Sequence, residues 1–186
     1  MNTLKIALLG AESTGKTTLA QALLEHFGTS NIAVTVVPEM LREFCTRENR
    51  VPLAHEQRAL MLAQIDAEEQ TENQAHSPAK KAQLIICDSA PITTAIYSSL
   101  YFSDDSLFEI ALAHHHQYTT SLVMATDIAW QADPLPFMRD GITAQAQFEQ
   151  RLQSWLKTTS ISHEQIDGAG PLRFERALSA IMRFIR

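Results

Sequence analysis

Residues 10–17 of the chain read Gly10-Ala11-Glu12-Ser13-Thr14-Gly15-Lys16-Thr17. This stretch satisfies the phosphate-binding pattern G-x-x-x-x-G-K-[ST] at every required position. An apolar run at 4–9 precedes it, and an amphipathic stretch at 16–27, closed by Gly28, follows it. The sequence therefore predicts a buried strand, a glycine-rich loop and a helix in the order that the P-loop motif requires.

The loop predicts binding of a nucleoside triphosphate. Its glycines allow backbone N–H groups to point at the β-phosphate, and the start of the following helix adds a favourable dipole. Lys16 is expected to bridge the β- and γ-phosphates, Thr17 to ligate Mg²⁺ and Thr18 to reach the α-phosphate. The residues expected to bind ATP are Gly10, Ser13, Thr14, Gly15, Lys16, Thr17 and Thr18.

Apolar runs alternate with amphipathic stretches along the whole chain. Further strands are expected at 32–37, 84–87, 121–125 and 161–166, with helices between them. Continuous apolar strands alternating with helices indicate a parallel sheet that is covered on both faces. We predict one domain over residues 1–186: a P-loop NTPase three-layer α/β/α fold with a five-stranded parallel sheet, a helical substrate pocket and a lid loop.

Composition excludes several classes of protein. The 186 residues are 45% hydrophobic and 19% charged, which is typical of a globular domain. A net charge of −6 without a basic stripe argues against nucleic-acid binding, and no apolar run reaches the roughly 20 residues of a membrane span. Two isolated cysteines, Cys45 and Cys87, favour a reducing, cytoplasmic location.

A second acidic residue fits nucleotide chemistry. Asp88 ends the apolar run 84–87, which is the arrangement that holds Mg²⁺ directly or through water. An ordinary aspartate at a strand end, or a helix cap, is the alternative. No Asn-Lys-x-Asp guanine motif follows the fourth strand, so GTPase activity finds no support. The chain is also short for a AAA-type motor with its helical lid domain.

Three further residues suit a small-molecule kinase. Glu39 follows the second strand through Pro38, where an acid orients or deprotonates the acceptor hydroxyl, and Arg42 lies one helical turn later. Arg139 lies in the loop after the fourth strand and is expected to act from a lid over the γ-phosphate. Charge compensation at a helix start is the alternative role for Glu39, and a solvated loop position is the alternative for Arg139.

Five segments of the sequence together resemble a known family. The matching segments are Gly-Ala-Glu-Ser-Thr-Gly-Lys-Thr-Thr-Leu at 10–19, Val-Val-Pro-Glu-x-x-Arg-Glu at 36–43, Cys-Asp-Ser-x-x-x-Thr-Thr-x-x-Tyr at 87–97, Asp-Ile-x-Trp at 127–130 and Arg-Asp-Gly at 139–141. In this order they resemble the ribosylnicotinamide kinase domain of NadR-type proteins. The resemblance implies ATP-dependent phosphorylation of the 5′-hydroxyl of nicotinamide riboside, which yields nicotinamide mononucleotide. Because the chain begins on the first strand, only the kinase step of NadR is expected.

The resemblance also implies roles for individual residues. Lys16 and Thr17 would serve ATP and Mg²⁺, Asp88 would serve Mg²⁺ or the acceptor hydroxyl, and Arg139 would be the lid arginine. Glu39 would contact the ribose or act as base, and whether Glu39 or Asp88 is the base stays open. Trp130 would flank the nicotinamide ring, with Asp127 and Asp133 supplying negative charge near the cationic pyridinium; plain packing is the alternative for Trp130.

The sequence departs from the family pattern on the substrate side. Met40 stands where the family usually has Tyr, and Ala129 stands where it has Pro. The segment 131–139 is longer and more apolar than the family's lid. Another nucleoside or nucleotide kinase, or a regulatory ATP-binding module without a small-molecule acceptor, therefore remain as alternatives.

Three other features are expected to be structural. The run His114-His115-His116 is not expected to bind one metal ion, because consecutive helical residues point about 100° apart. The acidic run from Asp66 to Glu72 is expected to be a solvated helix face. Trp155 belongs to the apolar stripe of its helix and is expected in the core.

Overall fold

A five-stranded parallel sheet forms the centre of the computed structural model, which describes residues 2–74, 82–132 and 141–185. Its strand order is β2-β3-β1-β4-β5, and every neighbouring pair is parallel. The expected five-stranded parallel sheet is confirmed. The strands are β1 (Asn2–Leu9), β2 (Ile32–Val37), β3 (Ala82–Asp88), β4 (Thr120–Met124) and β5 (His163–Ile166).

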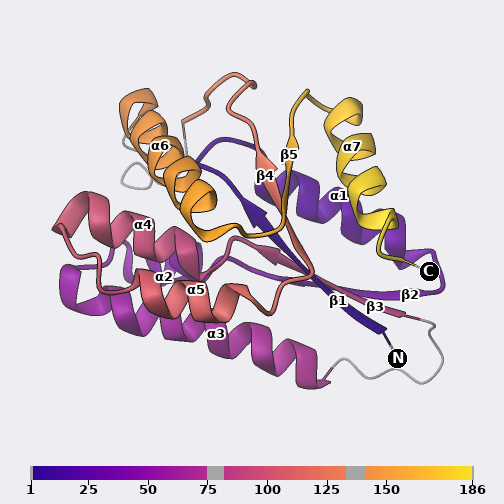
Figure 1. Ribbon diagram of the computed structural model, residues 1–186, viewed down its shortest axis with the longest axis horizontal. Coiled ribbons are helices and arrows are strands. Elements are labelled where there is room, and N and C mark those ends of the chain that lie inside the picture. Colours follow the sequence, from indigo (N-terminus) through magenta and orange to yellow (C-terminus); the bar gives the residue numbers. More distant parts are fainter. Residues whose placement is uncertain (1, 75–81, 133–140, 186) are drawn as a thin grey trace.

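Helices cover both faces of the sheet, so the predicted three-layer α/β/α architecture is confirmed (Figure 1). Because the strands bury apolar side chains on both faces, each face supports its own core. One face carries α1 (Lys16–Gly28) and α7 (Pro171–Met182). The other carries α3 (Gln57–Gln74), α4 (Pro91–Phe102), α5 (Phe108–His115) and α6 (Ile142–Thr159), while α2 (Met40–Glu48) and the short η1 (Ala54–Glu56) connect β2 to α3.

The predicted elements agree closely with the observed ones. Gly28 was expected to close α1, and it is the last residue of this helix, without a positive φ. The hydroxyls of Thr29 and Ser30 donate to the last carbonyls, those of His26 (3.1 Å) and Phe27 (2.7 Å). Side-chain donors therefore satisfy the helix end in place of a glycine turn. Trp155 lies in the core, as predicted.

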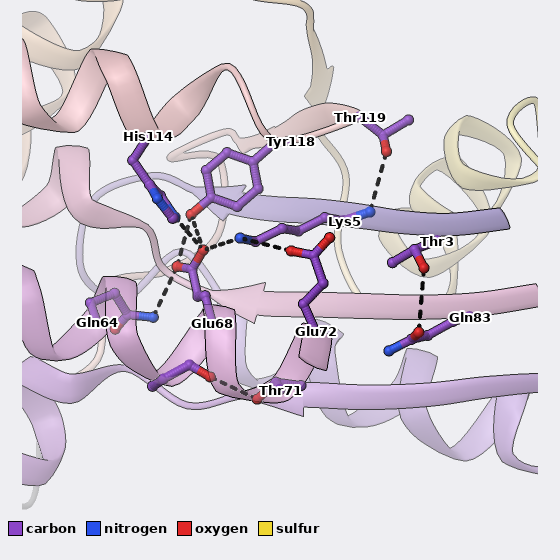
Figure 2. Close-up of polar contacts among 11 residues, drawn as sticks. Thr3, Lys5, Gln64, Glu68, Thr71, Glu72, Gln83, His114, Tyr118 and Thr119 are labelled. Atoms are coloured by element: carbon purple, nitrogen blue, oxygen red, sulfur yellow. Dashed lines mark hydrogen bonds and ion pairs between the residues drawn. The ribbon is translucent and has the colours of Figure 1, made fainter. Parts of the chain in front are cut away.

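The acidic run on α3 contains a buried carboxylate, so the expectation of a solvated face is wrong for Glu68. This side chain is 0% exposed and lies 3.1 Å from the Nζ of Lys5 on β1 (Figure 2). His114 Nε2 lies 2.9 Å from it, and the Tyr118 hydroxyl donates to both carboxylate oxygens at 2.8 and 2.7 Å. The period of the helix places Glu68 toward the sheet, where Lys5 supplies the opposite charge that a buried carboxylate requires.

The groups around Glu68 keep it ionised. Burial pushes the pKa of this carboxyl upward, but hydrogen bonds from His114 and Tyr118 and the charge of Lys5 outweigh burial and hold the pKa below its usual value. Burial also raises the pKa of the Tyr118 hydroxyl well above its ordinary value, so this group stays a donor. Glu68 is thus a permanently charged acceptor inside the protein at neutral pH.

Two of the three consecutive histidines are occupied by protein partners. His114 faces Glu68, and His115 Nε2 lies 2.7 Å from the Ser121 hydroxyl on β4. His116 is exposed. Their side chains thus point to different surroundings, as the helical geometry predicts. In the described part of the chain, no helix is long and apolar enough to span a membrane.

His115 predicts a pH dependence of stability. Burial lowers the pKa of this imidazole from 6.5 to about 3, so at intermediate pH the unfolded chain binds a proton that the folded chain does not. Stability is therefore lost as the pH falls below about 6.5, at up to about 1.4 kcal/mol per pH unit. His115→Gln should remove the contribution of about one proton to this slope, when the free energy of unfolding is measured in urea between pH about 6 and about 4. The same substitution at exposed His116 is the control, and an equal slope in both variants would contradict the prediction.

Candidate active site

The residues expected to form the site follow neighbouring strands at one edge of the sheet. Asp88 ends β3 and pairs in register with Leu8 of β1, directly before the loop that begins at Gly10. Val37 of β2 pairs with Cys87 of β3, which places Glu39 on the other side of Asp88. Since neighbouring strands lie about 4.8 Å apart, the loop, Asp88 and Glu39 form a row along the carboxyl edge.

The phosphate-binding loop requires glycine at both ends. Gly10 has φ 142°, and a Cβ there would lie 3.1 Å from the Met124 side chain and from its carbonyl. Gly15 has φ 81° and immediately precedes α1, where no side chain caps the helix. The first turn of α1 contains no acidic residue, so its N–H groups and dipole are not neutralised by a side-chain charge there. This geometry suits an anion.

Side chains within the loop hold its shape. The Lys16 ammonium donates to the carbonyls of Gly10 and Ala11, each at 2.9 Å. Thr14 is buried, and its hydroxyl donates to the Ala11 carbonyl at 2.8 Å. Thr17 and Thr18 are exposed in the first turn of α1, where Thr17 was expected to ligate Mg²⁺ and Thr18 to reach the α-phosphate.

Asp88 has the surroundings of a metal-binding acid. The residue is 5% exposed, and its Oδ1 is buried without a hydrogen-bond partner among the described residues. A buried oxygen of this kind is unfavourable unless something binds it. Because Mg²⁺ prefers hard oxygen ligands, Asp88 and the hydroxyl of Thr17 are chemically suited to this ion. The following residue, Ser89, is buried with φ 88°, an uncommon backbone conformation for a residue other than glycine.

Glu39 and Arg42 are presented by the start of α2. Glu39 is the N-cap residue in an extended conformation, and its side chain does not cap the helix. Both side chains are half-buried. The structure therefore brings Glu39 to the same sheet edge as Asp88 and places Arg42 one turn farther along the helix.

The segment after β4 meets the phosphate-binding loop. The Ser13 hydroxyl accepts a hydrogen bond from the Gln131 N–H at 2.8 Å, next to half-buried Trp130. The indole Nε1 of Trp130 is buried without a partner among the described residues. Arg139 and Asp133 lie outside the described residues, so the expected lid arginine is not located.

Asp127 has other partners than those expected. One of its carboxylate oxygens accepts from Arg173, and the other accepts from the Gly168 N–H at 2.6 Å. The expected role of Asp127 in substrate binding stays a prediction. In the structure this side chain joins the loops that follow β4 and β5.

Arg173 is a site residue that the sequence analysis missed. It is buried in α7, and its guanidinium donates to the carbonyls of Thr14, Ala125 (3.2 Å) and Gly168 (2.7 Å) as well as to Asp127. One sequence signal was present. Arg173 occupies the same helical stripe as the buried residues Ala177, Ala180 and Ile181, where a charge has to find partners inside the protein.

The comparison with known families agrees with this geometry. A family model described as an AAA domain matches residues 5–171. The chain belongs to this family. No curated protein matches this chain.

Solved structures resemble the AAA-domain chain in fold. A NadR protein in complex with NR aligns with TM-score 0.76 at 19% identity, covering 98% of this chain and 51% of that one. A NadR protein in complex with NAD and AMP-PNP aligns with TM-score 0.73 at 19% identity, covering 98% and 49%. The chain thus spans about half the length of these NadR chains. The expected resemblance to NadR is confirmed in fold.

Two other neighbours match over nearly their whole length. A deoxyadenosine kinase from M. mycoides, with the products dCMP and dCDP bound, aligns with TM-score 0.64 at 11% identity, covering 97% of this chain and 100% of that one. A thymidylate kinase from Ehrlichia chaffeensis aligns with TM-score 0.63 at 15% identity, covering 98% and 99%. The AAA-domain chain therefore has the fold of nucleoside and nucleotide kinases.

Arg173 should be needed for both stability and nucleotide binding. Arg173→Lys keeps the charge but not the planar set of donors, so we expect the free energy of unfolding to fall by about 2 kcal/mol. The dissociation constant of a non-hydrolysable ATP analogue should rise as well. Arg176→Lys, on the same helix in an exposed ion pair with Asp167, should change stability by less than about 0.5 kcal/mol. Urea unfolding and nucleotide titration measure both; equal effects at the two positions would contradict the assigned role.

Proposed function

We propose that this chain transfers the γ-phosphoryl group of ATP to a nucleoside hydroxyl, with the 5′-hydroxyl of nicotinamide riboside as the favoured acceptor. The observation that carries the proposal is the row at the carboxyl edge of the sheet. It contains a loop suited to an anion, a buried carboxylate oxygen of Asp88 that has no partner among the described residues, and the half-buried acid Glu39. A nucleotide-binding module without an acceptor would need only the loop and the metal-binding acid.

The loop and α1 would bind the triphosphate. N–H groups at the start of α1 would donate to phosphate oxygens, and the Lys16 ammonium would exchange its two carbonyl partners for the β- and γ-phosphates. Thr17 and Asp88 would hold Mg²⁺, which when bound neutralises charge on the phosphate oxygens. Arg139 would add positive charge over the γ-phosphate from the lid.

Glu39 would act at the acceptor. Its carboxylate would accept the proton of the acceptor hydroxyl while the new bond from that oxygen to the γ-phosphorus forms. The bond between the γ-phosphorus and the oxygen bridging it to the β-phosphorus breaks, and ADP leaves. Asp88 is assigned to the metal because its strand is the direct neighbour of β1, which leads into the phosphate-binding loop.

Nicotinamide riboside is favoured for chemical reasons as well as for the resemblance. Its pyridinium ring carries a positive charge, which an aromatic face stabilises. Trp130 lies beside the phosphate-binding loop through the neighbouring contact between Gln131 and Ser13, and we assign it to the nicotinamide ring. Arg42 would contact the ribose side of the acceptor from α2.

A panel of acceptors tests the proposal. The protein is incubated with Mg-ATP and one of several nucleosides or nucleoside monophosphates, including nicotinamide riboside, deoxyadenosine and thymidylate, and products are identified by mass. We expect one phosphoryl group to be added to nicotinamide riboside. If only another compound of the panel is phosphorylated, the kinase function stands and nicotinamide riboside is rejected as the acceptor. ATP hydrolysis at one rate whatever compound is added would reject the kinase in favour of a regulatory module.

Variants of Lys16 and Asp88 test the phosphate end. Lys16→Ala should lower kcat/KM by about a hundredfold or more, since it removes a charged donor to the reacting phosphate. Lys157→Ala, an exposed lysine on α6, is the control and should have no effect. Asp88→Asn should raise the Mg²⁺ concentration needed for half-maximal rate. An unchanged Mg²⁺ dependence with a collapsed acid limb of the pH profile would instead make Asp88 the base.

A further inference from the structure

The start of α2 is held by a side chain from another helix. Met40 is the first residue of α2, and its N–H donates to the Oε1 of Gln64 on α3 at 3.0 Å. The N–H groups of the first helical turn have no partner within their own helix, and an N-cap side chain usually serves one of them. Here Glu39 occupies the N-cap position without capping, and Gln64 supplies an acceptor from outside the helix. Glu39 thus marks the start of α2 without serving as the cap of this helix.

The orientation of the Gln64 amide is determined by Glu68. Gln64 is buried, and its Nε2 donates to the Oε1 of Glu68 at 3.2 Å (Figure 2). An ionised carboxylate only accepts hydrogen bonds, so the amide nitrogen has to face it. The amide oxygen must then point the other way, toward the Met40 N–H. A reversed amide would set two acceptors against each other at Glu68 and two donors against each other at Met40.

Glu68 in turn is fixed by groups from three other parts of the fold. Lys5 from β1, His114 from α5 and Tyr118 from the turn before β4 all contact its carboxylate (Figure 2). These partners leave the carboxylate little freedom to rotate away from Gln64. A continuous chain of polar contacts therefore runs from the centre of the sheet to the backbone next to Glu39.

We propose that Gln64 is a positioning residue for the acceptor acid: it holds the first turn of α2 and thereby aims Glu39 at the acceptor hydroxyl. The inference rests on the proposed function, because Glu39 is the acid assigned there. Small errors in the placement of a reacting group lower rates strongly, by about a hundredfold for 1 Å. Gln64 touches neither ATP nor acceptor in this scheme, so the effect of its loss should be seen in the acceptor step and not in ATP binding.

The test compares Gln64→Met with Gln83→Met. Methionine keeps the length and approximate volume of glutamine and removes both hydrogen bonds. Gln83 is an equally buried glutamine on β3, far from the site edge, whose Oε1 accepts from Thr3 at 3.4 Å. For Gln64→Met we expect faster hydrogen exchange at the Met40 amide, a kcat about ten- to a hundredfold lower and an unchanged KM for Mg-ATP. Gln83→Met should change none of the three.

A double-mutant cycle with Glu39→Gln identifies the route of the effect. If Gln64 acts through Glu39, then Gln64→Met should lower kcat no further once Glu39 has been replaced. If the double variant loses kcat by the product of the two single losses, the proposal is overturned. An equal change in kcat and in the KM for Mg-ATP would overturn it as well. If Gln64→Met does not fold, Gln64→Asn is measured in its place, because the shorter amide cannot reach both Met40 and Glu68.

Hydrogen exchange at Met40 separates this proposal from the proposed function. Unchanged exchange in the variant of an active kinase would overturn the positioning role and leave the kinase intact. Faster exchange in a protein that phosphorylates no nucleoside would overturn the kinase function, and with it the catalytic meaning of Gln64, while confirming that Gln64 holds α2.

Discussion

The arrangement of the phosphate-binding loop and its neighbouring loops depends on the hydrogen bonds of the Arg173 guanidinium. From α7 it reaches the loops that follow β1, β4 and β5, through the carbonyls of Thr14, Ala125 and Gly168. A trans peptide places the N–H of one residue opposite the carbonyl of the residue before it. When Arg173 binds the Thr14 carbonyl, the Gly15 N–H is therefore turned to the opposite side, away from the arginine. A buried cation bonded to the loop thus fixes the direction of the Gly15 N–H at the start of α1.

The other face of the sheet contains a buried charge pair with a different consequence. Lys5 and Glu68 neutralise one another, and His114, Tyr118 and Gln64 contact the remaining carboxylate positions. A buried pair of this kind contributes little net stability compared with apolar residues of the same volume. What an apolar core could not do is dictate the direction of a neighbouring amide. The acceptor-only character of Glu68 does this, and the result is transmitted to α2.

The parts of the fold that follow from local patterns were predictable from the sequence. The loop at 10–17 and the alternation of apolar strands with helices determine the architecture, and the carboxyl ends of parallel strands necessarily meet at one edge. The placements that failed depend on contacts between distant residues. Glu68 reads as part of a solvated acidic run because its partner Lys5 lies on another element. Arg173 reads as an ordinary helix residue until the loops that it binds are known.

In the proposed kinase, backbone groups serve one end of the site and side chains serve the other. This difference is why the fold does not determine the acceptor. At the phosphate end of the proposed site the contacts would come largely from backbone N–H groups, whose arrangement depends on Gly10, Gly15 and Arg173 and on the hydrogen bonds of Thr14 and Lys16 within the loop. At the proposed acceptor end they would come from side chains on α2 and on the segment after β4, which lie outside the sheet. Solved structures with this fold bear the names of NadR, deoxyadenosine kinase and thymidylate kinase at 11–19% identity. In the proposed kinase we therefore expect the choice of acceptor to depend on the surroundings of Glu39, Arg42 and Trp130.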